Sequence, residues 1–205
     1  AAPAAIAACT HNKPIGPAIL INSLLGDEAE VVGTVICGDN YFTENPEAAK
    51  EEGLKLTEYF KPDLFFAGPA FNAGRYGLSC GHMASAVSEK MNIPAVTGMA
   101  AENPSADIFR RNIYIVETGT HAGEMRKYVP KMVSIGLRCL KGEHIGSAAS
   151  EGYIIRDRIV NETQEETAAV RAVRMLTKKL RGEPFKSELI PPKFDEIEPA
   201  PPVTD

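Results

Sequence analysis

Residues 64–79 have the sequence LFFAGPAFNAGRYGLS, in which a short apolar run gives way to a polar segment rich in glycine. The apolar run at 64–67 predicts a buried strand, and the glycines after it let the backbone turn sharply. A helix from about Cys80 to Met91 is expected next, with its apolar side chains on one face. A strand, a loop and a helix in this order form the repeating unit of an α/β fold, and the loop is a candidate ligand site.

The same alternation of strands and helices extends along the chain. Pro and Gly residues mark the segment ends, as where Asn45-Pro46 begins a helix, with Asn45 as its cap, that Lys61-Pro62 ends. The β-branched run at 31–37 predicts a strand buried on both faces. These patterns predict a three-layer α/β domain with an open parallel sheet, Rossmann-like or flavodoxin-like in type. The other expected elements are a helix at 15–25, strands at 94–99 and 112–118, and helices at 121–140 and 163–181.

The predicted domain covers residues 15–182, and both ends of the chain lie outside it. Residues 1–14 are expected to form a poorly defined N-terminal arm; their start, AAPAAIAA, favours a processed or partial chain over a secretory signal. Residues 183–205 are rich in proline, which is typical of an extended arm or linker. The segment 142–160 fits either a loop or an edge strand.

The composition is that of an ordinary globular protein, with 44% hydrophobic and 24% charged residues. The formal net charge of -5 argues against general nucleic-acid binding. No apolar run approaches the roughly 20 residues of a membrane-spanning helix. The four cysteines include no CxxC pair and the histidines show no metal-ligand spacing, so we expect no metal site. A reducing, cytoplasmic setting fits this cysteine pattern best.

Polar loops follow each predicted strand. In an open parallel sheet, ligands bind at the carboxyl ends of the strands, where loops and helix N-termini gather. Arg75 presents a planar fork that suits a carboxylate, while Asp39 or Glu102 would attract an amine. This arrangement is typical of a site for a small amino acid or its derivative. The candidate binding residues are Asp39, Asn40, Tyr41, Asn72, Arg75, Tyr76, Glu102 and Asn103, with Thr118 and His121 on the same loops.

Each of these residues also has an ordinary structural interpretation. Asp and Asn after strands most often serve as turn and cap residues, and the loop around Arg75 also fits a surface turn. Cys80 and His82 suggest a thiol nucleophile with its base, because a thiol at a helix N-terminus has a lowered pKa. Residues two apart on a helix do not face each other, however, and free Cys is commonly buried and inert. No catalytic residue is therefore expected on this chain.

Several longer segments carry a more specific signal. They are VICGDNYFTENPEAA at 35–49, PDLFFAGPAFNAGRYG at 62–77 and IPAVTGMAAENP at 93–104, followed in order by YIVETG, VPKMVSIGLRCLKGE and KKLRGEPF. From about residue 28 onward, the chain resembles the selenoprotein B subunit of glycine, sarcosine and betaine reductases. The selenocysteine motif of that family lies in the C-terminal half of its subunit, and nothing like that half is present here.

This resemblance implies a component of a multi-subunit, selenium-dependent reductase of amino-acid-fermenting anaerobes. Such complexes reductively cleave the C–N bond of glycine or of an N-methylated glycine. The implied partners are a selenocysteine-bearing C-terminal half or subunit, a pyruvoyl-bearing subunit and selenoprotein A. The selenocysteine and the pyruvoyl group are expected on those partners, and no cofactor on this chain. The chain itself is expected to help bind the substrate and to hold the partners.

Two other interpretations stay open. The chain would also suit a free-standing module that binds an amino acid or a methylated amine without turnover. It would equally suit a structural half whose strand-end loops pack on a partner. For betaine, a quaternary ammonium, an aromatic cage is expected. Its candidates are Tyr41, Phe42, Phe71 and Tyr76, but the sequence does not choose among the three substrates.

Overall fold

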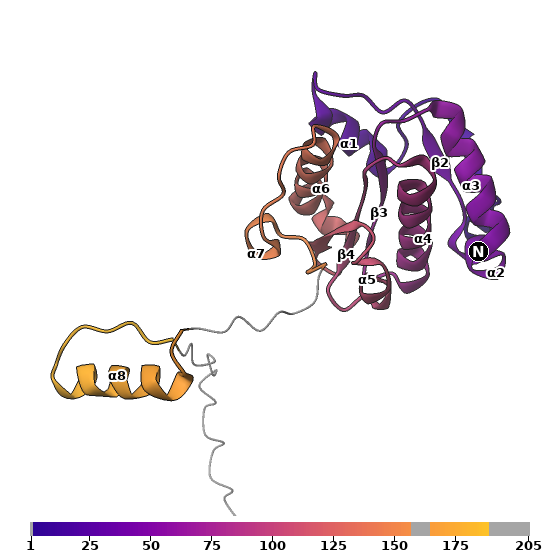
Figure 1. Cartoon of the computed structure of the whole chain (residues 1–205). Coiled ribbons are helices and arrows are strands. Elements are labelled where there is room, and N and C mark those ends of the chain that lie inside the picture. The colour runs from indigo at the N-terminus through magenta and orange to yellow at the C-terminus, as the bar shows by residue number, and fades with distance from the viewer. Residues whose placement is uncertain (1, 157–164, 189–205) are drawn as a thin grey trace, which may run out of the picture. The chain divides into compact units, whose positions relative to one another are not determined.

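The computed structural model describes residues 2–156 and 165–188. It divides the chain into two compact units, Ala1–Arg158 and Ile159–Asp205. Figure 1 shows the first unit as a sheet between helices. Among the described helices, none combines the length and apolar character that a membrane crossing requires.

A three-stranded parallel sheet forms the centre of the first unit. Its strands are β3 (Phe65–Phe71), β4 (Ala95–Ala100) and β5 (Tyr114–Thr118), in the order β3-β4-β5. Every residue of β4 is buried. Because this central strand is covered on both faces, its sequence is apolar throughout rather than alternating. Three of the four predicted strands are therefore confirmed as neighbours in one parallel sheet, while the Rossmann-like or flavodoxin-like assignment stays a prediction.

Helices cover both faces of this sheet. On one face, α4 (Gly74–Met91) and α5 (Pro104–Phe109) pack against Met99 of β4. On the other, α6 (Met125–Leu140), preceded by η2 (Ala122–Glu124), packs with α1 (Pro17–Leu25) against Val96. Figure 1 shows the sheet between α6 and α1 on one side and α4 on the other. The three layers expected from the sequence are present.

The predicted strand at 31–37 is not part of this sheet. Only Thr34–Ile36 form a strand, β2, which pairs antiparallel with β1 (Cys9–His11) in a separate two-stranded sheet. The prediction of a parallel strand buried on both faces was wrong, since all three residues of β2 are only half-buried. The apolar pattern indicated burial correctly but not the strand partner, which comes from the expected N-terminal arm. That arm also holds a short helix, η1 (Ala2–Ala5).

One short helix replaces a loop that the sequence predicted. Residues 39–44, expected to be a polar loop, form α2 (Asp39–Glu44), whose Phe42 is only 2% exposed. The Tyr41 hydroxyl donates to the Glu52 carboxylate of α3 (Pro46–Phe60) at 3.2 Å, which ties the two helices together. Asn45 does not cap α3 as predicted, because its side-chain amide donates back to the Tyr41 carbonyl at 3.2 Å.

The polar segment at 68–79 is mostly regular structure rather than loop. Strand β3 continues to Phe71 through a register shift after Ala67, and helix α4 begins at Gly74. This early start is possible because glycines let α4 approach its neighbours closely. A Cβ at Gly77 would lie 2.6 Å from the Asn103 amide nitrogen, and one at Gly81 would lie 2.0 Å from the Phe109 ring.

The segment at 142–160, for which the sequence leaves a loop and an edge strand open, is mostly loop in its described part, 142–156. It includes a short helix, α7 (Ala148–Glu151), and a single antiparallel bridge between Tyr153 and Val116 of β5. The backbone N–H of Ile154 also donates to the Ile115 carbonyl at 2.8 Å. This segment therefore touches the β5 edge of the sheet without forming a full strand.

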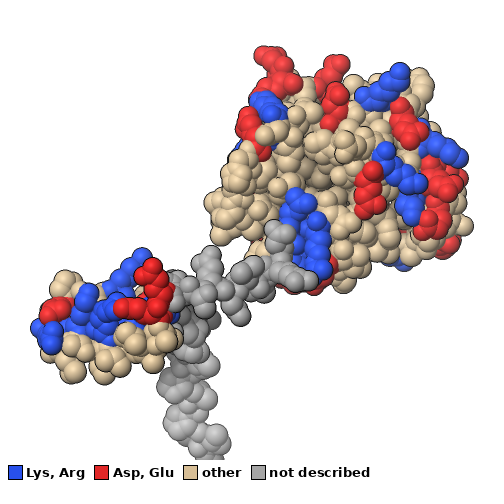
Figure 2. Space-filling model, viewed as in Figure 1, with Lys and Arg blue, Asp and Glu red and all other residues tan. Residues whose placement is uncertain are grey.

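The second unit contains helix α8 (Ala168–Leu180). Thr167 caps it, accepting from the Val170 N–H at 3.4 Å, so within the described residues the helix begins later than the predicted start at 163, which itself lies outside them. Lys178 and Lys179 occupy the last turn, where cations are favourable. Figure 2 shows charged side chains along one side of α8 and uncharged ones along the other. Most of the expected Pro-rich arm also lies outside the described residues.

Candidate functional site

An exposed cation and a half-buried anion meet where α2 and α4 begin. The Arg75 Nε lies 3.6 Å from Oδ2 of Asp39, and the two side chains are 64% and 30% exposed. Asp39 opens α2, and Arg75 lies in the first turn of α4, directly after the end of β3. No other partner contacts the Arg75 guanidinium within the described residues. Its terminal nitrogens are therefore available to a ligand carboxylate.

Tyr76 follows Arg75 and connects this surface to the interior. The residue is 36% exposed, yet burial of its hydroxyl raises its pKa, and the adjacent Cys80 and Asp39 act in the same direction. The phenol is neutral at physiological pH and can donate one hydrogen bond. The hydroxyl interacts with the buried Cys80 side chain, and Tyr76 is not suited to act as a base.

The Cys80 thiol lacks the features of a nucleophile. Cys80 is buried, and this burial raises its pKa to about 12. His82 does not serve as its base, because the imidazole packs against Phe42 and Phe109 at ring-centroid distances of 6.2 and 4.9 Å. Burial also lowers the pKa of His82. A neutral buried thiol with no adjacent base is typical of a structural cysteine.

Asn103 is a structural residue of the sheet edge. It is 2% exposed, and its Oδ1 accepts from the Ser105 N–H at 3.0 Å, which caps α5. Its amide donates to the carbonyls of Phe71 at 3.0 Å and Ala73 at 3.4 Å. The side chain therefore joins the end of β3 to the start of α5, and both of its amide hydrogens are used within the chain. Asn103 positions Asn72 but offers no donor to a ligand.

The other predicted residues divide into free and engaged side chains. Asn72 and Glu102 are exposed, and their side chains make no hydrogen bond or ion pair with the part of the chain that the structure describes. Asn40 has a buried Oδ1 without a hydrogen-bond partner in that part of the chain. Tyr41 is held by Glu52, and Thr118 donates to the Gly119 carbonyl at 2.9 Å. His121 is exposed beside η2.

The aromatic cage expected for betaine is not assembled in the described residues. Phe42 and Phe71 are 2% and 5% exposed, so both belong to the core rather than to an aromatic cage. No group of three or more His, Cys, Asp or Glu side chains could hold a metal ion in residues 2–156 and 165–188. The remaining arrangement is a small polar surface of Asp39, Asn72 and Arg75 with Tyr76 at its edge.

Sequence reasoning missed a large apolar cavity that adjoins this surface. Its volume is about 710 Å³, and Tyr76, Ser79 and Cys80 line one part of it. The run at 31–37 predicted burial against the sheet, but no signal in the sequence indicated that the space beside β3 would stay open.

The comparison with protein families covers nearly the whole chain. Residues 2–205 match the family model described as glycine/sarcosine/betaine reductase selenoprotein B. The chain belongs to this family.

Individual relatives carry the names of all three reductases. The chain is 49% identical over 192 residues to the glycine reductase complex component B subunit gamma of Carboxydothermus hydrogenoformans. It is 46% identical over 191 residues to the sarcosine reductase complex component B subunit beta of Peptoclostridium acidaminophilum. It is 40% identical over 196 residues to the betaine reductase complex component B subunit beta of the same organism.

These matches cover most of this chain but less than half of each relative. They span 94%, 93% and 95% of this chain, and 44%, 44% and 45% of the three relatives in the same order. The chain therefore spans under half the length of the curated relatives it matches. No solved structure matches it.

Proposed function

We propose that this chain is the substrate-binding and scaffolding part of component B in a glycine, sarcosine or betaine reductase complex. The complex would reductively cleave the C–N bond of glycine or of an N-methylated glycine. The observation that carries the proposal is the exposed Arg75 guanidinium, 3.6 Å from the Asp39 carboxylate. A cation and an anion side by side complement the carboxylate and the ammonium of an amino acid.

The division of roles follows from the chemistry of each side chain. Arg75 would hold the substrate carboxylate through its planar fork, and Asp39 would attract the amine. Asn72, at the end of β3, would orient the substrate through hydrogen bonds. Glu102 offers a second carboxylate from the end of β4. The start of α4 adds a favourable field for the substrate carboxylate, since its first N–H groups have no side-chain cap.

This chain would not complete the reaction alone. Among its side chains, Cys80 is buried with a raised pKa and is a poor nucleophile. The reactive selenocysteine and a pyruvoyl group would come from partner chains, together with selenoprotein A as the next acceptor. All four cysteines of this chain are free, which supports a reducing, cytoplasmic setting for the complex.

Binding measurements on Arg75 variants test the proposed site. Calorimetry would titrate glycine, sarcosine and betaine into the chain and into the complex that copurifies with it. Charge-assisted hydrogen bonds contribute about 1.5–3 kcal/mol, so Arg75→Ala should weaken substrate binding about 10- to 100-fold. Arg75→Lys should recover only part of this loss, because an ammonium lacks the fork. Arg111→Ala is the matched control. Arg111 is exposed and lies before the start of β5, whereas Arg75 lies after the end of β3, so this variant should bind the substrates as the parent chain does.

Two results would overturn the proposal. If Arg75→Ala and Arg111→Ala bind all three substrates equally well, Arg75 has no role in recognition. If mass spectrometry of the copurifying complex finds neither a selenocysteine-bearing nor a pyruvoyl-bearing chain, the assignment to a reductase complex fails. Tight binding of an amino acid by this chain alone, without such partners, would instead favour a free-standing binding module.

A further inference from the structure

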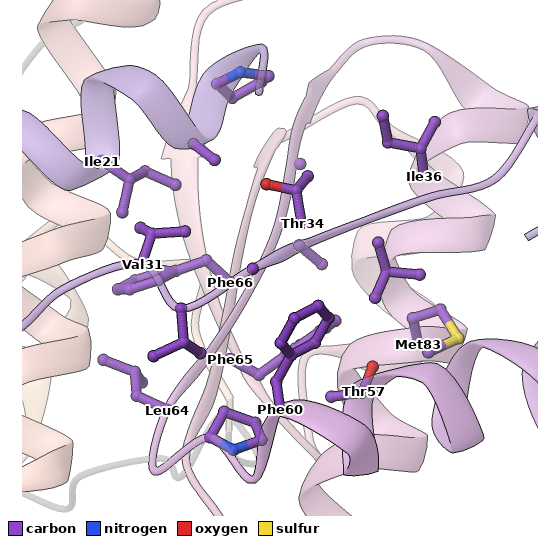
Figure 3. A pocket seen from close by; sticks show the side chains of 18 of the residues that line it. Ile21, Val31, Thr34, Ile36, Thr57, Phe60, Leu64, Phe65, Phe66 and Met83 are labelled. Carbon is purple, nitrogen blue, oxygen red and sulfur yellow. The ribbon is translucent and has the colours of Figure 1, made fainter. Parts of the chain in front are cut away.

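A large apolar cavity lies along the free edge of β3. Its volume is about 710 Å³, within the range of ligand-binding pockets. Within the described residues, β3 pairs only with β4, and β2 pairs only with β1. Residues of both β2 and β3 line the cavity. The cavity therefore lies between two strands that are not hydrogen-bonded to each other. Figure 3 shows Thr34 and Ile36 of β2 opposite Phe65 and Phe66 of β3.

The cavity occupies the position of a further strand of the sheet. Its lining includes Ile21 of α1, which belongs to the helical layer on one face of the sheet. It also includes Met83 of α4, which belongs to the layer on the other face. In Figure 3, Phe66 points toward Ile21 and Phe65 points toward Phe60. A strand placed beside β3 would therefore direct alternate side chains into two apolar layers that already exist.

The backbone of β3 has unused hydrogen-bonding capacity on this side. The Phe65 N–H donates to the Pro94 carbonyl, at the start of β4, at 3.0 Å. Because the direction of backbone groups alternates along a strand, the N–H and carbonyl of Phe66 face away from β4 toward the cavity. Unpaired strand edges of this kind readily accept another strand.

The exposed residues that line the cavity are both charged and apolar, and the charged ones are Glu28, Glu30, Lys61 and Asp63. Of the apolar ones, Val32 and Leu140 are 47% and 37% exposed. Ile19 of α1 is 60% exposed on the same layer as Ile21. Figure 2 shows charged side chains gathered over α3 and a largely uncharged surface between α3 and α7. Exposed apolar surface around an apolar cavity is typical of a protein interaction site.

We propose that the cavity receives an extended apolar strand from the portion of the family polypeptide that this chain does not span. The C. hydrogenoformans relative has more than half of its length outside the matched region. The strand would pair with Phe66 and complete a four-stranded sheet between the two helical layers. Its side chains would be apolar on both faces, since Ile21 and Met83 line opposite sides. The proposal rests on family membership and does not depend on the Arg75 site.

Hydrogen exchange tests this pairing directly. The added polypeptide is the part of the C. hydrogenoformans relative outside the region that matches this chain, produced separately and mixed with the full chain. The Phe66 amide should exchange rapidly in the free chain and become protected in the mixture. The amides of β4 should be protected in both. If the Phe66 amide is already as protected as those of β4 in the free chain, the edge is not open and the proposal fails.

A charge placed in the cavity gives an independent test. Ile36→Lys introduces a cation on a half-buried cavity wall, whereas Ile108→Lys, the matched control, changes a side chain that is 59% exposed on α5. Burying an unpaired cation is unfavourable, so Ile36→Lys should weaken binding of the added polypeptide at least about tenfold. Ile108→Lys should bind as the parent chain does.

Three binding results would overturn the proposal. The first is that the added polypeptide does not bind, and the second is that Ile36→Lys and Ile108→Lys bind it equally. The third is binding with no new protection at Phe66, which would place the contact elsewhere. Circular dichroism of both variants checks that they fold. If Ile36→Lys does not fold, the hydrogen-exchange experiment on the unaltered chain tests the proposed strand pairing by itself.

Discussion

Replacing Asn103 should destabilise the first unit far more than replacing a typical surface asparagine. Asn103→Ala removes the cap of α5, which costs about 1 kcal/mol. It also leaves the buried Phe71 carbonyl without its donor, which costs a further 1–3 kcal/mol or so. The Ala73 carbonyl is less important, because Ala73 is exposed and water can replace the lost bond. The expected loss is therefore about 3 kcal/mol in the free energy of unfolding.

Urea unfolding followed by circular dichroism measures this loss, and a thermal scan should show Tm lowered by roughly 6–12 °C. Asn112→Ala is the matched control, since the exposed Asn112 makes one side-chain hydrogen bond, to Glu89 at 3.0 Å. It should stay within about 0.5 kcal/mol of the parent. If Asn103→Ala is no more destabilising than Asn112→Ala, the assignment of Asn103 as the link between β3 and α5 is wrong.

Asn103→Asp separates the two functions of the side chain. An aspartate keeps the oxygen that caps α5 but turns a charged acceptor toward the Phe71 and Ala73 carbonyls. The folded state should then favour the protonated carboxyl, so the pKa of the new group is raised on folding. Stability relative to the parent should be highest at low pH and fall as the pH rises through that pKa. A stability difference that does not change between pH 4 and pH 7 would contradict this reasoning.

Two further predictions concern α4. Gly81→Ala should lower the free energy of unfolding in urea by about 1–3 kcal/mol, because its Cβ would lie 2.0 Å from the Phe109 ring. Gly74→Ala is the control: its Cβ meets no atom within 4 Å, so it should be neutral or stabilising. Equal effects of the two substitutions would contradict the close packing at Gly81. Cys80, with a pKa of about 12, should resist alkylation in the folded chain at pH 8. Because the pKa of Cys80 is raised on folding, the free energy of unfolding should fall as the pH rises above the ordinary thiol pKa, by up to about 1.4 kcal/mol per pH unit. Cys80→Ala should reduce that slope, and an unchanged slope would assign it to other groups such as Tyr76.

The sequence predicted best those elements whose ends are marked by local chemistry. Helix α3 begins at Pro46 and ends at Phe60, as expected from the prolines on either side, and Lys61 adopts a left-handed conformation after it. Helix α4 ends at Met91, where Asn92 is also left-handed. These signals act over a few residues, so they do not depend on the rest of the fold.

Two of the failures involve contacts that the local sequence does not specify. The run at 31–37 indicates burial, but its pairing with Cys9–His11 depends on a segment without a strand signal. The residues of α2 resemble a turn in composition, and the burial of Phe42 stabilises a helix there instead. Tertiary packing outweighs local preference in both cases. Asn103 illustrates the same limit at the site, since cap chemistry was foreseeable and its bond to Phe71 was not.

The placement of the polar residues on helices changes what the candidate site can do. Arg75 was expected on a glycine-rich loop, and a loop residue loses conformational entropy if a ligand must order it. In the structure its backbone belongs to the first turn of α4, whose glycines pack against Asn103 and Phe109. Only the side chain of Arg75 therefore needs to be ordered by a substrate. Asp39 is fixed in a similar way, because α2 is anchored by the buried Phe42. A site built from two packed helices is preorganised, and this favours recognition of a ligand as small as an amino acid.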